Sequence, residues 1–269
     1  VGGTDGTHGA ARIGATFPHM SIMGRELPQK MQEAGFEIRT FMPKWGTINE
    51  RRGQLHEVIR LSGMNLIIDD TDHPLIIKVA SIPTTRQQIY FIDNDDYFKS
   101  RQMGTDENGK EYADNGERAI FFARGVLETV KKLRWQPDVI VCQGWASAVV
   151  PFYVKTAYSE EPSFAESKVI TALYTNELKG ELGTNFKRCV AFRDAKSELL
   201  DGYQDDFNFI ELGKLAIDYS DGVVEGEEEA NQILFDYAKE KNKPVLAYPG
   251  EDIQEPYADF INKVCPDAE

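Results

Sequence analysis

Short runs of acidic residues carry the first candidate chemistry in this sequence. Asp93, Asp95 and Asp96 follow a predicted strand, and a pair of carboxylates is what acid/base chemistry on a sugar linkage requires. The run 69–73 (DDTDH) contains a D-x-D pattern that could hold a divalent cation against a diphosphate. That run lies between two apolar segments and ends in Pro74, which is typical of a solvated hairpin turn. Neither run defines a site by itself.

The histidines and cysteines do not complete a catalytic or metal-binding pattern. No histidine has a Ser, Cys or carboxylate partner at a suggestive spacing, and the cysteines form no CxxC or Cys/His pair. The glycine-rich segment 2–9 has the composition of a phosphate-binding loop but neither the preceding strand nor the following helix and lysine. We therefore expect no metal and no cofactor. The residues concerned are His8, His19, His56, His73, Cys142, Cys189 and Cys265.

Composition indicates an acidic globular protein. The 269 residues carry a formal net charge of −14, which argues against a nucleic-acid or anionic-membrane surface. No apolar run approaches the roughly 20 residues of a membrane span, and the first residues lack the basic-then-apolar pattern expected of a signal peptide. We expect a cytoplasmic protein with a flexible lead-in over 1–18 and a single domain over 19–269.

Hydrophobic periodicity predicts an α/β fold with an antiparallel β-hairpin insertion near its start. Helical spacing marks 24–34, alternation marks a strand at 36–42, and four short apolar runs between 56 and 92 fit hairpins. Strands then alternate with helices, which is typical of βαβ units on a parallel sheet. The later strands are predicted at 138–142, 168–174, 222–225 and 244–248, and the later helices at 116–134, 145–158, 211–219, 227–241 and 255–264.

Five longer strings resemble segments of bacterial glycogen and starch synthases, which form glycosyltransferase family 5, and of short synthase-like proteins in particular. Their order and spacing hold from about residue 24 to residue 225, so that together they are a specific signal. The strings are 42–52 (MPKWGTINERR), 90–98 (YFIDNDDYF), 114–124 (DNGERAIFFAR), 135–145 (WQPDVIVCQGW) and 218–224 (DYSDGVV).

The resemblance implies a three-layer α/β/α Rossmann-like lobe of the GT-B type, the N-terminal half of a two-lobed glucosyltransferase. Members transfer glucose from ADP-glucose to an α-1,4-glucan with retention of configuration and without a metal. Aromatic and amide side chains that bind sugars are then the expected ligands. The candidate substrate-binding residues are Asp93, Asn94, Tyr97, Asp114, Asn115, Arg118, Gln143 and Trp145.

Two of these assignments have structural alternatives that the sequence leaves open. Trp145 either stacks on a sugar or packs a helix behind the predicted strand 138–142. Asp114 or Asn115 can cap the helix that follows, and Arg118 can point toward a cleft or into the protein.

The sequence also departs from the family pattern. The region of the K-x-G-G-L loop, 15–23, has no lysine and no glycine pair, and the three histidine positions of H-x-H-D-W-H hold Val141, Gln143 and Ala146. A further family histidine is missing near 173–175 (LYT), and one βα unit over 244–264 stands where a donor lobe would begin. We therefore expect no glucosyl transfer by this chain alone. ADP-glucose would bind only if a partner supplied the donor lobe, and the alternative is a non-catalytic glucan-binding or scaffold protein with a protein partner.

Overall fold

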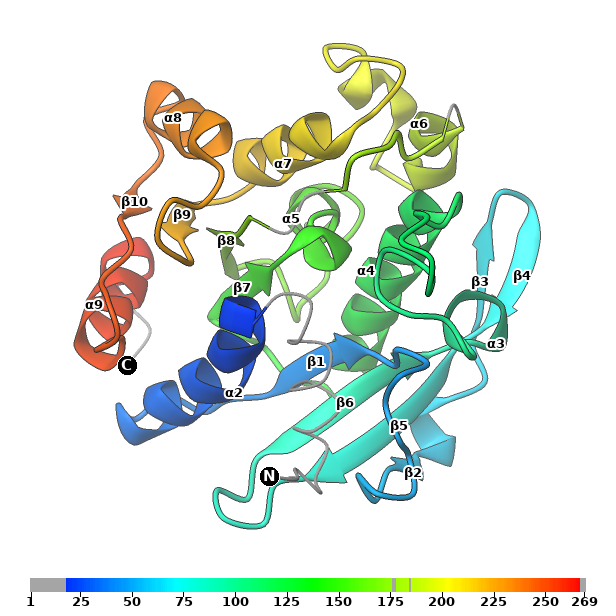
Figure 1. The fold of residues 1–269 in the computed structure, drawn as a ribbon, viewed down its shortest axis with the longest axis horizontal. Helices are drawn as coiled ribbons and strands as arrows, with labels where there is room; N and C mark the ends of the chain where they lie inside the picture. Colours follow the sequence, from blue (N-terminus) through cyan, green and yellow to red (C-terminus); the bar gives the residue numbers. More distant parts are fainter. Residues whose placement is uncertain (1–17, 176–177, 184, 267–269) are drawn as a thin grey trace. The chain divides into compact units, whose positions relative to one another are not determined.

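The computed structural model describes residues 18–175, 178–183 and 185–266, and side chains from residue 24 onward. These residues divide into two compact units, one up to residue 110 with 253–255 and the other from residue 111 to 252 with the described residues from 256 onward. Figure 1 shows the helices and strands of both. Within the described residues, no helix is long and apolar enough to cross a membrane. The single domain expected over 19–269 stays a prediction.

The first unit is built on a mixed sheet with the strand order β1-β6-β5-β2. Strand β1 pairs parallel with β6, whereas β6 with β5 and β5 with β2 pair antiparallel. The hairpin β3–β4 turns at Asp69 and Asp70, both with positive φ. The turn predicted over 69–73 is therefore shorter than expected, because Thr71–Pro74 pair with β3 as strand β4. The elements are α2 (Pro18–Glu33), β1 (Thr40–Pro43), β2 (His56–Glu57), β3 (Asn65–Ile68), β4 (Thr71–Pro74), β5 (Ile76–Ser81), β6 (Gln88–Asp93) and α3 (Asp95–Phe98).

The second unit is built on a fully parallel sheet with the strand order β10-β9-β8-β7. The βαβ units predicted from the second half of the sequence are therefore confirmed. The elements are α4 (Asn115–Lys132), β7 (Val139–Gln143), α5 (Val150–Lys155), β8 (Lys168–Leu173), α6 (Phe186–Val190), α7 (Phe209–Asp218), β9 (Gly222–Glu225), α8 (Gln232–Glu240), β10 (Val245–Leu246) and α9 (Gln254–Val264).

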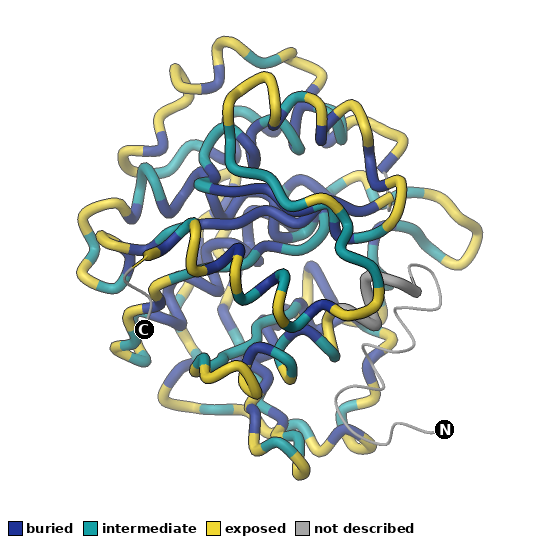
Figure 2. The backbone as a smooth tube through the Cα atoms, turned by 90° about the vertical axis from the view of Figure 1, so that its left-hand side faces the viewer, coloured by how far each residue is buried: buried dark blue, intermediate teal, exposed yellow. Residues whose placement is uncertain are grey.

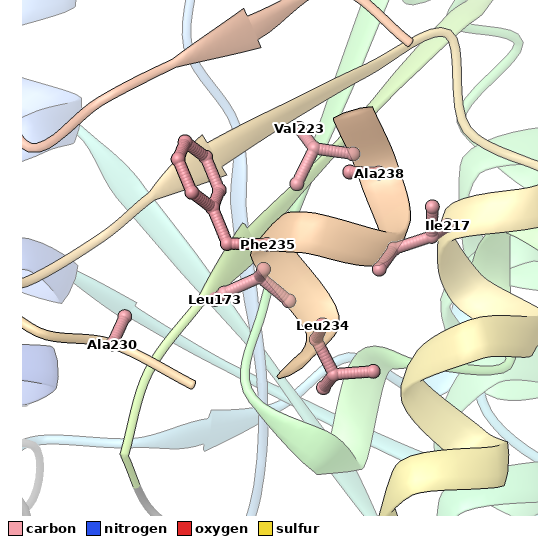
Figure 3. Close-up of a cluster of buried hydrophobic side chains, with 7 residues drawn as sticks. All are labelled: Leu173, Ile217, Val223, Ala230, Leu234, Phe235 and Ala238. Atoms are coloured by element: carbon pink, nitrogen blue, oxygen red, sulfur yellow. The ribbon is translucent and has the colours of Figure 1, made fainter. Parts of the chain in front are cut away.

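A buried apolar cluster joins the parallel sheet to helices α7 and α8. Leu173 and Val223 contribute from neighbouring strands, and Leu234 and Phe235 contribute from α8 (Figure 3). Strand β8 is buried along nearly its whole length, as expected for a central parallel strand. Buried residues follow the strands, and exposed residues gather in the connecting loops and along one side of the helices (Figure 2).

Several predicted elements differ from the structure in type or extent, and three of them differ most in how they begin or in what they form. The helix expected over 145–158 is a 3₁₀ turn at Trp145–Ser147 followed by the short α5. The helix expected over 227–241 begins only at Gln232, because the side chain of Asn231 accepts a hydrogen bond from the Leu234 N–H and caps α8 there. The run expected as a strand over 56–61 forms only the two-residue β2 before a 3₁₀ turn.

Candidate functional site

A network of charged side chains lies at the end of β6 in the first unit. Lys78 and Asp93 are diagonal neighbours on β5 and β6, and Lys78 Nζ lies 2.7 Å from Asp93 Oδ2. The same ammonium group also donates to the Glu50 carboxylate. Burial lowers the pKa of Lys78, but the hydrogen bonds that its ammonium group donates to the Asp93 and Glu50 carboxylates, together with their negative charge, outweigh burial, so the pKa is raised. Lys78 is therefore positively charged at neutral pH, and its ammonium group forms an ion pair with the Asp93 carboxylate.

Asn94 and Tyr97, which follow Asp93, also have partners within the first unit. The Asn94 side chain accepts hydrogen bonds from two N–H groups of α3 and donates to Pro74 O at 2.9 Å. The Tyr97 hydroxyl lies 3.0 Å from His73 Nε2, while His73 Nδ1 lies 3.1 Å from an Asp96 carboxylate oxygen. These contacts fasten the hairpin β3–β4 to α3. The Y-F-I-D-N-x-x-Y-F string therefore has a structural role in this chain.

The start of α4 in the second unit holds three more of the predicted residues. Asp114 occupies the N-cap position, but its side chain accepts no capping hydrogen bond, so of the two caps that the sequence left open the one by Asp114 does not form. Arg118 is buried, donates to Asn115 Oδ1 at 3.0 Å, and lies 4.8 Å from the centre of the Tyr112 ring. Arg118 thus points into the protein in this structure.

A second group of polar side chains lies at the carboxyl edge of the parallel sheet. We use this name for the residues at and after the ends of β7, β8, β9 and β10. In open α/β sheets this edge is the usual place for a ligand. The Tyr174 hydroxyl donates to Gln143 Oε1 at 3.3 Å, which joins the ends of β8 and β7. Trp145 begins the turn after β7 and is only 3% exposed, so its ring packs within the protein.

Two carboxylates extend the carboxyl edge across β9 and β10. Glu225 accepts from the Tyr248 N–H at 3.0 Å and from Gln232 at 2.8 Å. Glu227 accepts from both the N–H and the hydroxyl of Thr175, at 2.5 and 2.6 Å. Together with Gln143 and Tyr174, these groups present an amide, hydroxyls and two negative charges.

Gly226 is required for the close packing at this edge. A Cβ atom at residue 226 would lie 2.6 Å from Tyr174 Cζ and 2.8 Å from Leu173 O. Such distances are shorter than van der Waals contact, so a larger residue would displace the Tyr174 ring. The glycine between Glu225 and Glu227 thereby fixes the ring that holds Gln143.

Comparison with known proteins identifies the family. Residues 19–246 match the family described as the starch synthase catalytic domain. This chain belongs to the starch synthase catalytic-domain family. It is 40% identical over 156 residues to a glycogen synthase of Chlorobium limicola, covering 58% of this chain and 32% of the relative. It is 33% identical over 195 residues to a glycogen synthase of Chlorobaculum parvum, covering 72% and 39%.

Solved structures support the same fold. The catalytic domain of starch synthase IV from Arabidopsis thaliana, solved with ADP and acarbose, has a TM-score of 0.64 at 16% identity and covers 82% of this chain. This chain covers 46% of that structure and about a third of the curated relatives. The GT-B lobe implied by the sequence strings is thus confirmed as the fold.

The starch synthase pattern is altered where its histidines would stand. Val141, Gln143 and Ala146 occupy the positions of H-x-H-D-W-H at the end of β7. Cys142 between them is buried, and burial raises the pKa of its thiol to about 12, which keeps it un-ionised. No group of acidic, histidine or cysteine side chains suited to a metal ion occurs in the described part of the chain. The groups able to bind a ligand at the carboxyl edge are therefore hydrogen-bonding amides, hydroxyls and carboxylates.

The structure places three of the eight predicted site residues in the first unit and five in the second. Asp93, Asn94 and Tyr97 share one network, and Asn115 and Arg118 share another. Sequence reasoning missed Tyr174, Glu225 and Glu227 as members of the carboxyl edge. Their position directly at or after predicted strands was the available signal. The region 15–17, part of the expected K-x-G-G-L segment, lies outside the described residues.

Proposed function

We propose that this chain is the glucan-side part of a glycogen/starch-synthase-like glucosyltransferase, and that it binds α-1,4-glucan in the cytoplasm. The observation that carries the proposal is the chemistry of the carboxyl edge. Gln143, Tyr174 and Thr175 offer neutral donors and acceptors, whereas Glu225 and Glu227 are anionic. A departing diphosphate needs positive charge and N–H donors, so these five residues suit a neutral glucan and not a nucleotide.

Glycogen binding is the direct test of this proposal. Electrophoresis of the purified chain in gels containing glycogen should retard the wild type relative to gels without it. Gln143→Ala removes an amide from the edge and should weaken retention about two- to tenfold, the range of one neutral hydrogen bond. Gln29→Ala is the matched control, because Gln29 is exposed on α2 of the first unit and bonds only to Glu33 among the described residues. Equal mobility of all three proteins with and without glycogen would refute glucan binding.

Glucosyl transfer is expected to be absent for the polypeptide of 269 residues by itself. Ala146 cannot donate or accept a side-chain hydrogen bond where the family carries histidine, and loss of one such contact typically costs about 2.7–4 kcal/mol in the transition state. The measurement is incorporation of radiolabelled glucose from ADP-glucose into glycogen, with and without a host lysate. Incorporation by the pure chain well above the blank would contradict the proposal. Incorporation only with lysate would indicate a partner that supplies the donor site. Binding without any transfer would favour the non-catalytic glucan-binding alternative.

A further inference from the structure

Tyr257 on α9 has a hydroxyl group without a partner. The residue is 2% exposed, its hydroxyl is sealed from solvent, and no hydrogen bond to it is found in the described part of the chain. Buried tyrosine hydroxyls are normally hydrogen-bonded, because an unpaired polar group loses its contact with water and gains nothing in return. Such a group calls for an explanation, and a ligand is one.

Tyr257 lies near the start of α9, toward the carboxyl edge of the parallel sheet. Helix α9 packs on β9 at Gly222, the first residue of that strand. A Cβ atom at residue 222 would lie 2.9 Å from Val264 Cγ2 and 3.0 Å from Phe260 Cζ, so both side chains contact the strand there. Tyr257 precedes them by one to two turns. Its hydroxyl interacts electrostatically with Tyr248, which follows β10, and with Tyr174, which follows β8. Burial first, and then Tyr248, raises the pKa of Tyr257, so the group is an un-ionised donor.

Gln143 and Tyr174 supply the complementary groups. Because Tyr174 donates to Gln143 Oε1, the amide is oriented and its Nε2 hydrogens are left to donate elsewhere. No hydrogen bond from Gln143 Nε2 occurs among the described residues, and Gln143 is only half-buried. The Tyr257 hydroxyl and the Gln143 amide are thus uncharged donors, and uncharged donors match a ligand that carries several hydroxyl groups.

We infer that Tyr257, Gln143 and Tyr174 form one binding site for a neutral polyhydroxylated ligand, with Tyr257 donating a hydrogen bond to it. The inference rests on the proposed function, under which the ligand is an α-1,4-glucan. It adds a binding residue from α9, which lies beyond the segment 19–246 that matches the family. Helix α9 is therefore part of the site and not only a packing element.

The sealed position of the Tyr257 hydroxyl sets a kinetic condition. A ligand reaches it only after a local opening of the protein around α9. The segment that leads into α9 contains Gly250, with a φ of +84°, and the exposed Glu251 and Asp252. Binding that waits for such an opening associates more slowly than a preformed, open site allows.

Tyr257→Phe tests the inference by two independent readouts. The first is the affinity for maltoheptaose by isothermal titration calorimetry, which should fall roughly three- to tenfold, as for one neutral hydrogen bond. The second is the melting temperature of the ligand-free chain, which should stay the same or rise, because the substitution removes a hydroxyl that has no partner. Tyr219→Phe is the matched control, since Tyr219 follows α7 near the amino end of β9, away from the carboxyl edge. It should leave the affinity unchanged.

The outcomes separate this inference from the proposed function. If the wild type does not bind maltoheptaose, the proposed function fails, and the inference falls with it. If the wild type binds and Tyr257→Phe binds equally well, only the inference is overturned. A marked drop in the melting temperature of ligand-free Tyr257→Phe would also overturn it, because the hydroxyl would then be satisfied within the protein.

Discussion

A chain that lacks residues 243–269 is expected to lose cooperative thermal unfolding and to aggregate. The deletion removes β10 and α9, and with them the buried side chains Tyr257, Phe260 and Ile261. Burying one large apolar side chain contributes about 1.5–3 kcal/mol, and a typical domain is stable by only about 5–15 kcal/mol. The loss of three such residues, together with the edge strand beside β9, is therefore sufficient to unfold the second unit.

Differential scanning calorimetry and size-exclusion chromatography measure this effect. A chain that ends at Pro266 retains β10 and α9 and serves as the control, so it should melt cooperatively at the temperature of the full chain. A soluble deletion variant with an unaltered melting profile would show that the C-terminal βα unit is dispensable for the fold.

The regular elements of the second unit could be predicted because local sequence and tertiary context agree there. Strand β8 and helix α4 lie within two residues of their predicted bounds. A β-branched run favours a buried strand, and a long apolar face at helical spacing favours a helix packed on the sheet, so sequence and packing agree. The helix predicted over 227–241 is a case in which local sequence and tertiary context disagree. It follows the acidic residues 225–229. Carboxylates near a helix start are favourable, but Asn231 caps α8 and Glu229 adopts a φ of +55°, which is incompatible with a helix. Because the cap at Asn231 follows these acidic residues, helix α8 begins later than the sequence predicted.

The candidate sites depended on pairings that spacing along the chain does not encode. Tyr174 meets Gln143 because the parallel register sets Gln143 opposite Ala172. Lys78 meets Asp93 for the same kind of reason, in an antiparallel register that sets Ile76 opposite Asp93. A shift of one residue would turn either side chain to the other face. The family resemblance could locate the strings, but it could not show that Asn94 and Tyr97 bond to their own neighbours.

Lys78→Met is expected to destabilise the first unit by about 2–3 kcal/mol. The substitution keeps the length of the side chain but leaves the buried Asp93 carboxylate without its cation, and an unpaired buried charge typically costs about 3–5 kcal/mol. We expect less than that range because the Lys78 side chain is 21% exposed, so water screens part of the interaction. The free energy of unfolding by urea measures the effect. Lys30→Met, at an exposed ion pair with Glu33, is the control and should change it by less than about 0.5 kcal/mol.

A double-mutant cycle with Asp93→Asn shows whether the charge pair is responsible. The substituted amide would keep an oxygen that accepts from the Asn94 N–H, as Asp93 Oδ1 does at 2.9 Å, and would remove the charge. The double variant should therefore be more stable than Lys78→Met alone, with a coupling of about 1 kcal/mol or more. Because the pKa of Lys78 is raised above 10.5 in the folded chain, its contribution is complete at neutral pH and is lost as the pH rises through that raised pKa. The difference between wild type and Lys78→Met should accordingly be constant from about pH 6 to about pH 9 and shrink only above about pH 10.5. Additive effects of the two substitutions would mean that Lys78 stabilises the sheet through packing of its methylene groups and not through Asp93.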